Sequence, residues 1–214
     1  MRKIIFLIIS LLIISCENMN DNQPAKIVFL GDSITQQAED FEDGFISLIR
    51  QNLVQDKFEL VGKGIGGNKV SDLLTRYKSD VIDLNPDIVF IYIGINDVWH
   101  KYDFGTGSDI DLYEKGLRTI ISDIKSLGSK IVLCTPTVIG ENTGDFVLGN
   151  QFKDVETMEK IADHYQIPTI NFGPEVLRRV NAGKLLFKGD EAAKDTIEVF
   201  SPDNVHPYTD SGHK

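Results

Sequence analysis

The chain has 214 residues, of which 42% are hydrophobic and 25% are charged. This length suits one domain of ordinary size built around a single core. The formal net charge is −10. A strongly acidic surface argues against nucleic acid as a partner and against adhesion to anionic lipid by charge.

The first fifteen residues have the pattern of a signal peptide. Arg2 and Lys3 precede an apolar run over 4–14, which is too short for a comfortable membrane span. The run ends at Ile13-Ile14-Ser15-Cys16, which resembles a bacterial lipobox and implies cleavage before Cys16 and attachment of lipid to it. An ordinary secretory signal with an incidental cysteine is the alternative.

Three segments are therefore expected: a signal peptide over 1–15, a lipidated Cys16 with a short polar tether over 16–25, and one folded domain over 26–214. Cleavage would remove two positive charges and no acidic residue, so the net charge would become −12. Several acyl chains on one cysteine anchor a protein stably, because each buried methylene contributes about 0.8 kcal/mol. We expect a membrane-anchored bacterial lipoprotein outside the cytoplasm, on the periplasmic or cell-surface face, attached by its lipid alone.

Cys134 is the only other cysteine, so a disulfide framework is excluded. It lies in an apolar segment, and we expect it to be buried as a small hydrophobic residue.

Apolar strands alternate with helical patterns along the rest of the chain. The expected strands are 27–30, 58–61, 88–93, 131–134 and 169–171, and the helical patterns between them include Phe45 to Leu53, Val70 to Tyr77, Tyr113 to Leu127 and Val155 to Tyr165. Strands that are apolar at nearly every position suit a parallel sheet buried on both faces. The alternation predicts an α/β fold, a three-layer α/β/α sandwich with a flavodoxin-like, doubly wound sheet of about five parallel strands. Two irregular stretches, 102–109 and 184–201, are expected to shape a binding site.

Residues that could take part in catalysis follow the first three strands. In sheets of this kind, ligands bind beyond the carboxyl ends of the strands. Ser33 is the candidate nucleophile, and its hydroxyl needs a base within hydrogen-bond reach. His206 is the natural base. Asp203 lies three residues earlier, a spacing that can return its carboxylate to the imidazole and fix the tautomer.

Four segments in order resemble the SGNH, or GDSL-like, family of serine esterases and acylhydrolases, from about Lys26 to the end of the chain. They are Gly31-Asp32-Ser33-Ile34, Gly64-Ile65-Gly66-Gly67-Asn68, Gly94-Ile95-Asn96-Asp97 and Asp203-Asn204-Val205-His206-Pro207. The resemblance implies that the oxyanion donors are the backbone N–H groups of Ser33 and Gly67 and the side-chain amide of Asn96.

The chain departs from the family pattern at three places. Ile34 stands where leucine is common, and Gly62 stands where the glycine segment usually opens with asparagine. Gly64 and Gly66 therefore remain alternatives to Gly67, which we choose because a small polar residue, Asn68, follows it. The chain also ends at Lys214, where the family normally continues with a closing helix, so we expect a truncated C-terminal helix.

The resemblance implies a serine esterase that works through an acyl-enzyme and needs no metal or organic cofactor. A small-molecule or carbohydrate ester is the expected substrate, and we favour acetyl groups on carbohydrate because no long apolar stretch suggests a lipid-binding lid. A lysophospholipase or thioesterase on the same site is one alternative. A lipid-anchored carbohydrate-binding protein without turnover is another. The sequence carries no mark of the oligomeric state.

Other polar residues have simpler interpretations. Asp32 and Asp97 are expected to brace turns through backbone hydrogen bonds rather than to serve as triad acids. His100, His164 and His213 lack the spacing of a metal site, and His164 is expected to be solvated. The segment that follows Asn96 contains Trp99, His100 and Tyr102. These side chains are candidates for packing against a sugar ring or an acyl chain, or simply beneath the loop.

Overall fold

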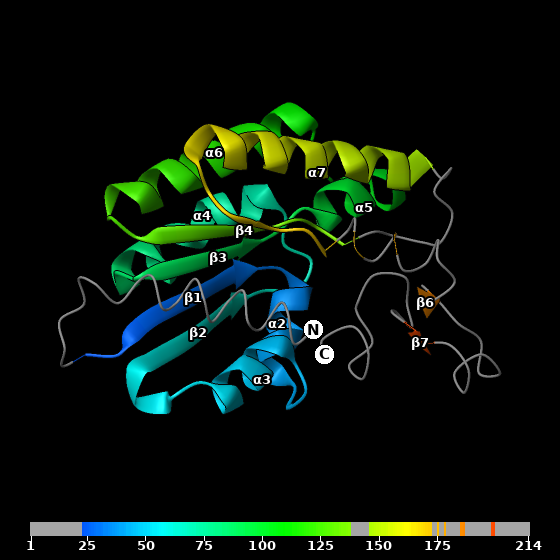
Figure 1. Cartoon of the computed structure of the whole chain (residues 1–214). Coiled ribbons are helices and arrows are strands. Elements are labelled where there is room, and N and C mark those ends of the chain that lie inside the picture. Colours follow the sequence, from blue (N-terminus) through cyan, green and yellow to red (C-terminus); the bar gives the residue numbers. More distant parts are fainter. Residues whose placement is uncertain are drawn as a thin grey trace.

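The computed structural model describes residues 23–137, 146–172, 175, 178, 185–186 and 198–199. Five parallel strands form one sheet, and their order across it is β2 (Phe58–Gly64), β1 (Ala25–Gly31), β3 (Ile88–Tyr92), β4 (Lys130–Cys134) and β5 (Thr169–Ile170). Figure 1 shows the labelled arrows of β1 to β4 running in one direction. This is the flavodoxin-like order of a doubly wound sheet. The predicted α/β fold class is confirmed.

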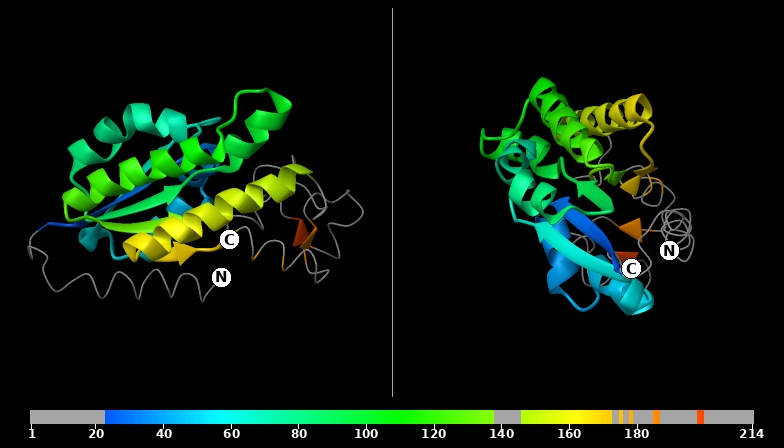
Figure 2. Two further views of the ribbon diagram at one scale, coloured as in Figure 1. Left: turned by 90° about the horizontal axis from the view of Figure 1, so that it is seen from above. Right: turned by 90° about the vertical axis from the view of Figure 1, so that its left-hand side faces the viewer.

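Helices cover both faces of the sheet because successive strand residues point to opposite sides. Val28 and Leu30 belong to one apolar cluster and Ile27 and Phe29 to the other. The first cluster is completed by α4 (Val70–Asp80), α6 (Ile110–Ser126) and α7 (Phe146–Tyr165), and the second by α2 (Ser33–Asp40) and α3 (Phe45–Asn52). Figure 2 shows α4, α6 and α7 side by side over the sheet. The three predicted layers are therefore present.

The order in which successive strands are added to the sheet reverses at β1, although all the strands are parallel. This strand pairs with β2 on one side and with β3 on the other, so that Ile27 is level with both Leu60 and Ile88. The connections that leave β1 and β3 pass to different parts of the fold, into α2 and into α5 (Ile95–Asp103). Such a switch point opens a crevice at the carboxyl edge, which is where this class of fold binds its ligands.

The expected irregular stretches contain regular structure. Helix α5 extends to Asp103, inside the stretch 102–109, and two short parallel strands, β6 (Leu185–Leu186) and β7 (Glu198–Val199), pair within 184–201. Helix α2 begins at Ser33, well before the helical pattern expected from Phe45, and is separate from α3. Short 3-10 turns over Gln55–Lys57 and Ile82–Leu84 precede β2 and β3. Short elements of this kind bury too few residues to leave a clear periodic pattern.

Two predictions about single residues are confirmed. Cys134 is buried in the cluster beneath α2 and α3, and this burial raises the pKa of its thiol to about 12. His164 is exposed near the end of α7.

The predicted signal peptide, Cys16 and most of the tether lie outside the described residues. Within the described ranges, no helix combines the length and the apolar character needed to cross a membrane.

Candidate active site

Ser33 is the first residue of α2 and lies just beyond the carboxyl end of β1. Asp32 caps this helix, and its carboxylate accepts a hydrogen bond from the backbone N–H of Ile34 at 3.0 Å. Gly31 permits the turn, because a Cβ at this position would overlap the Thr35 side chain. The segment thus presents a half-buried Ser33 at a helix start, where backbone N–H groups have no acceptor within the helix.

The glycine segment after β2 lies against the start of α2. The Gly66 N–H donates to Oε1 of Gln36 at 2.8 Å, and a Cβ built on Gly66 would lie 3.9 Å from that of Ser33. Gly67 has a φ of +75°, which favours glycine. Among the described residues, no hydrogen bond engages the Gly67 N–H, whereas Gln36 engages that of Gly66. This difference supports the choice of Gly67 as donor over Gly66.

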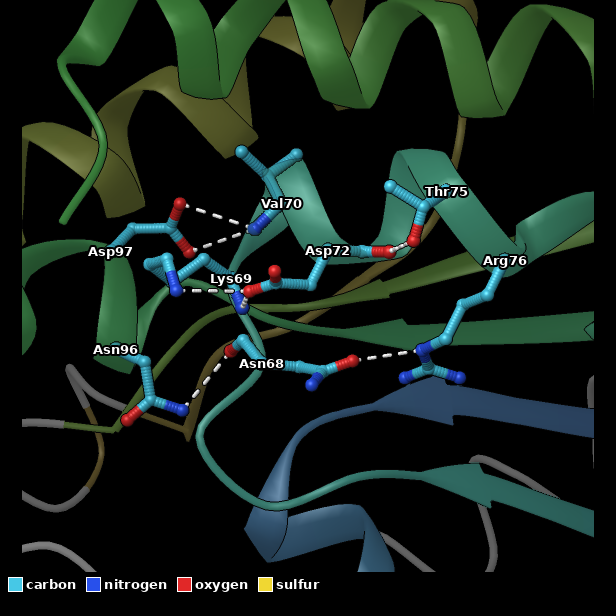
Figure 3. A network of polar contacts seen from close by, with 8 residues as sticks. All are labelled: Asn68, Lys69, Val70, Asp72, Thr75, Arg76, Asn96 and Asp97. Atoms are coloured by element: carbon cyan, nitrogen blue, oxygen red, sulfur yellow. Dashed lines mark hydrogen bonds and ion pairs between the residues drawn. The ribbon is translucent and has the colours of Figure 1, made fainter. Parts of the chain in front are cut away.

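Asn96 comes from the first turn of α5 and is fully buried. Its Nδ2 donates to the backbone oxygen of Asn68 at 3.0 Å (Figure 3). Because an amide nitrogen carries two hydrogens, one N–H remains for another acceptor. Gly94, which precedes the helix, has a φ of +133°, and a Cβ there would lie 2.8 Å from the Tyr113 hydroxyl. The structure therefore links the third predicted donor directly to the residue after Gly67.

Asp32 and Asp97 brace backbone turns, as predicted. Both carboxylate oxygens of Asp97 lie 3.2 Å from the backbone nitrogen of Val70, at the start of α4 (Figure 3). Burial raises the pKa of Asp97 to about 6, and burial, reinforced by the nearby charge of Asp97, raises the pKa of Asp32 to about 7. These two poorly solvated carboxyl groups accept hydrogen bonds from backbone N–H groups at the starts of α2 and α4.

An aromatic cluster lies beside the glycine segment. Trp99, His100 and Phe104 have ring centroids between 5.2 and 5.7 Å apart, and Phe104 is 60% exposed. Cε1 of His100 would lie 3.6 Å from a Cβ built on Gly67, and partial burial lowers the pKa of His100. Of the three candidate substrate-binding residues, His100 therefore lies next to the predicted oxyanion donor, and Trp99 packs against His100. The side chain of the third, Tyr102, lies outside the described part of the structure.

Asp203 and His206, the predicted orienting acid and base, lie outside the described residues, as does Cys16. Their roles therefore remain predictions. Among the residues that are described, no group of three or more His, Cys, Asp or Glu side chains could hold a metal ion.

Three residues at this edge were not predicted from the sequence. Gln36 holds the glycine segment, Phe104 completes the aromatic cluster, and Arg76 bonds to Asn68 and to the ends of β1 and β2. Phe104 follows His100 by four residues, which is one helical turn and a detectable signal. Gln36 contacts a backbone N–H, and two of the four acceptors of Arg76 are backbone oxygens. Backbone groups leave no side-chain pattern in a sequence.

Comparison with known proteins identifies the family. Residues 29–214 match the GDSL-like Lipase/Acylhydrolase family. The chain belongs to this family. It is a carboxylic ester hydrolase with the fold of SGNH hydrolases, as the four motifs predict.

Its relatives include acetylxylan esterases. One, from Geobacillus stearothermophilus, is 36% identical over 212 residues, covering 88% of each chain. The solved structure of the acetyl xylan esterase AlAXEase is 33% identical with a TM-score of 0.75, covering 86% of this chain and 92% of that one. The structure of Axe2, an acetylxylan esterase from Geobacillus stearothermophilus, is 28% identical with a TM-score of 0.74 and covers 91% of each.

Replacing Asn96 with alanine should lower kcat for ester hydrolysis about 10²–10³-fold, because the developing oxyanion would lose one preorganised donor. Steady-state hydrolysis of p-nitrophenyl acetate measures the effect. Asn52→Ala is the matched control, since Nδ2 of Asn52 also donates to a backbone oxygen, that of Leu48, at the exposed end of α3. A folded Asn96→Ala protein with kcat within about threefold of the control would exclude Asn96 as an oxyanion donor.

Asp32→Asn should change how stability depends on pH. The Asp32 pKa is about 7 in the folded protein, against an ordinary value of 3.8, so the folded state binds more protons between these values. The protonated Asp32 carboxyl stabilises the folded state at low pH. This stabilisation is lost as the pH rises through the pKa that Asp32 has in the folded protein. Asparagine does not titrate and keeps an oxygen for the Ile34 N–H.

We therefore expect the free energy of unfolding of the wild type, relative to Asp32→Asn, to fall by about 2 kcal/mol from pH 5 to pH 8. Urea unfolding at intermediate pH values measures this difference. Asp111→Asn, on the exposed side of α6, controls for the loss of one acidic residue. A difference between wild type and Asp32→Asn that stays flat with pH would contradict the prediction.

Proposed function

We propose that this esterase removes acetyl groups from carbohydrate by way of an acyl-enzyme on Ser33. The observation that carries the proposal is the meeting of Ser33, the Gly66-Gly67 loop and Asn96 at the switch point of the sheet. The relatives named as acetylxylan esterases support the acetyl group and the carbohydrate.

In the proposed reaction, Oγ of Ser33 attacks the ester carbonyl carbon while His206 takes the hydroxyl proton. The carbonyl oxygen becomes an oxyanion, held by the N–H groups of Ser33, Gly67 and Asn96. Collapse of this intermediate breaks the bond to the sugar oxygen, which receives the proton from His206. Water then attacks the acetyl-enzyme by the same steps and releases acetate, so that Ser33 and His206 return to their starting states.

The triad partners of Ser33 are supported by one relative. Solved structures of Axe2 include catalytic mutants at a serine, an aspartate and a histidine, with the aspartate three positions before the histidine. Asp203 and His206 have the same spacing and follow Ser33 in the same order. A carboxylate in that position would hold the imidazole in the tautomer that accepts the serine proton.

The aromatic cluster supports a sugar as the group that carries the ester. Phe104 exposes a ring beside Trp99 and His100, and this cluster adjoins Gly67. Apolar faces of sugar rings pack well on exposed aromatic rings, which combine a large apolar area with few rotatable bonds. An acetyl group on such a sugar would then reach Ser33 without a deep acyl pocket.

Hydrolysis of p-nitrophenyl acetate, butyrate and octanoate, together with acetate release from acetylated xylo-oligosaccharides, tests this function. The rate should be highest for acetate, and Ser33→Ala should reduce it about 10⁴-fold or more. Ser47→Ala is the matched control, because Ser47 lies on α3 and its hydroxyl bonds only to the Glu39 carbonyl among the described residues.

Two results would overturn the proposal. A rate that rises towards octanoate would favour a lysophospholipase or thioesterase on the same site. Binding of oligosaccharide without any hydrolysis, and without labelling of Ser33 by a fluorophosphonate, would favour a carbohydrate-binding protein.

The proposed site of action is outside the cytoplasm, with Cys16 carrying the lipid that anchors the protein to a bacterial membrane. Cys16→Ser should move the full-length protein from the membrane fraction to the soluble fraction, since a cysteine thiol is needed for lipid attachment. Cys134→Ser is the control, because Cys134 is buried in the folded domain. Membrane association that survives Cys16→Ser would rule out this anchor.

A further inference from the structure

Arg76 lies in the middle of α4 and forms hydrogen bonds with four groups. Its Nε donates to Oδ1 of Asn68 at 2.8 Å, and its Nη2 donates to the Gly31 backbone oxygen at 2.8 Å. Its Nη1 donates to the Lys63 backbone oxygen at 3.0 Å and to Oδ2 of Asp80 at 2.6 Å. Only 14% of the side chain is exposed. The guanidinium is thus built into the fold rather than free at the surface.

Three of these acceptors flank the predicted oxyanion donors along the chain. Gly31 is two residues before Ser33, and Lys63 and Asn68 stand on either side of residues 64–67, which include Gly67. Gly31 and Lys63 also lie at the ends of two neighbouring strands, β1 and β2. One planar group therefore fixes the strand ends from which two of the three donors follow.

The third donor is reached through Asn68. Arg76 holds the side chain of Asn68, and the backbone oxygen of the same residue accepts the hydrogen bond from Nδ2 of Asn96. Figure 3 shows this line of contacts from Arg76 through Asn68 to Asn96. A shift of Asn68 would change both the path of the glycine segment and the orientation of the Asn96 amide.

The guanidinium suits this task better than an ammonium would. It offers five N–H donors in a rigid plane, so several acceptors are held in one geometry, whereas lysine offers a compact charge on a flexible stem. The carboxylate of Asp80, one helical turn further along α4, neutralises the charge of Arg76 and holds the Arg76 side chain against α4.

We propose that Arg76 is a positioning residue that sets the mutual geometry of the three oxyanion donors, Ser33, Gly67 and Asn96. This inference rests on the proposed function. A purely structural role, in which Arg76 only satisfies the carbonyl groups of two strand ends, would lower stability and leave the chemical step unchanged.

The test compares Arg76→Lys and Arg76→Gln with Arg50→Ala. Arg50 is a matched control, because it also bonds to one carboxylate, that of Glu39, and to one β2 carbonyl, that of Leu60. It does so towards the opposite end of β2. For each protein, kcat and KM for p-nitrophenyl acetate, the inhibition constant of a boronic acid that forms a tetrahedral adduct on serine, and urea unfolding are measured.

Arg76→Lys and Arg76→Gln should lower kcat about 10-fold and about 100-fold, with KM changed less than about threefold, because the lost interactions matter most in the transition state. The boronic acid should bind more weakly by similar factors. Arg50→Ala should lose stability while its kcat and inhibition constant stay within about twofold of the wild type.

Asn68→Ala extends the test to a variant that leaves Arg76 and the strand ends intact. It removes the Nε contact and keeps the backbone oxygen that orients Asn96, so kcat should fall, and Arg76→Lys should have a smaller effect in this background than in the wild type. If Arg76→Gln does not fold, Arg76→Lys and Asn68→Ala decide the question.

Folded Arg76 variants whose kcat and inhibition constant match those of Arg50→Ala would overturn the positioning role while leaving the esterase function intact. A wild-type protein that hydrolyses no ester would instead overturn the proposed function, and the positioning role with it.

Discussion

The active-site edge depends on the close approach of α2 to the ends of β1 and β2, which is possible only where side chains are missing. A Cβ at Gly31 would overlap the Thr35 side chain and lie 2.5 Å from the Tyr92 backbone oxygen, and a Cβ at Gly64 would overlap the backbone of α2. Larger residues would therefore push the helix away from the sheet. Ser33 begins this helix, and Gln36, three residues later, holds the glycine segment. The predicted nucleophile and the segment would therefore be displaced together.

Two buried carboxylates hold the helices that start at this edge. Asp32 accepts a backbone N–H in the first turn of α2, and Asp97 accepts one at the start of α4. A buried N–H left without an acceptor costs about 1–3 kcal/mol, so these contacts offset part of the desolvation of the acids. Burial also raises both pKa values, and the negative charge of Asp97 raises that of Asp32 further. The fold thus tolerates two acids near Ser33 because each satisfies the backbone of a helix.

The sequence predicts the strands and the motif residues well because their signals are local. Residues 88–92 are apolar at every position and are all buried in β3, and Ser33 and Asn96 lie two and four residues beyond the ends of β1 and β3, as their motifs indicate. Helix α5 is harder to predict, because it has nine residues and follows β3 almost directly. The contacts of Arg76 with Gly31 and Lys63 could not be predicted, since their acceptors are backbone oxygens, which every residue carries.

The orientation of the Asn96 amide follows from one contact. Nδ2 donates to the Asn68 backbone oxygen, and Oδ1 has no hydrogen-bond partner among the described residues. Turning the amide over would place Oδ1 against that carbonyl oxygen, so that two acceptors would face each other and the bond would be lost. The two hydrogens on an amide nitrogen have a fixed angle between them, so the contact that directs the first also directs the second. A donor held in this way needs no reorganisation when charge develops on a bound ester. Because the orienting carbonyl follows Gly67 directly in the chain, the loop that is predicted to supply one oxyanion donor also aims another.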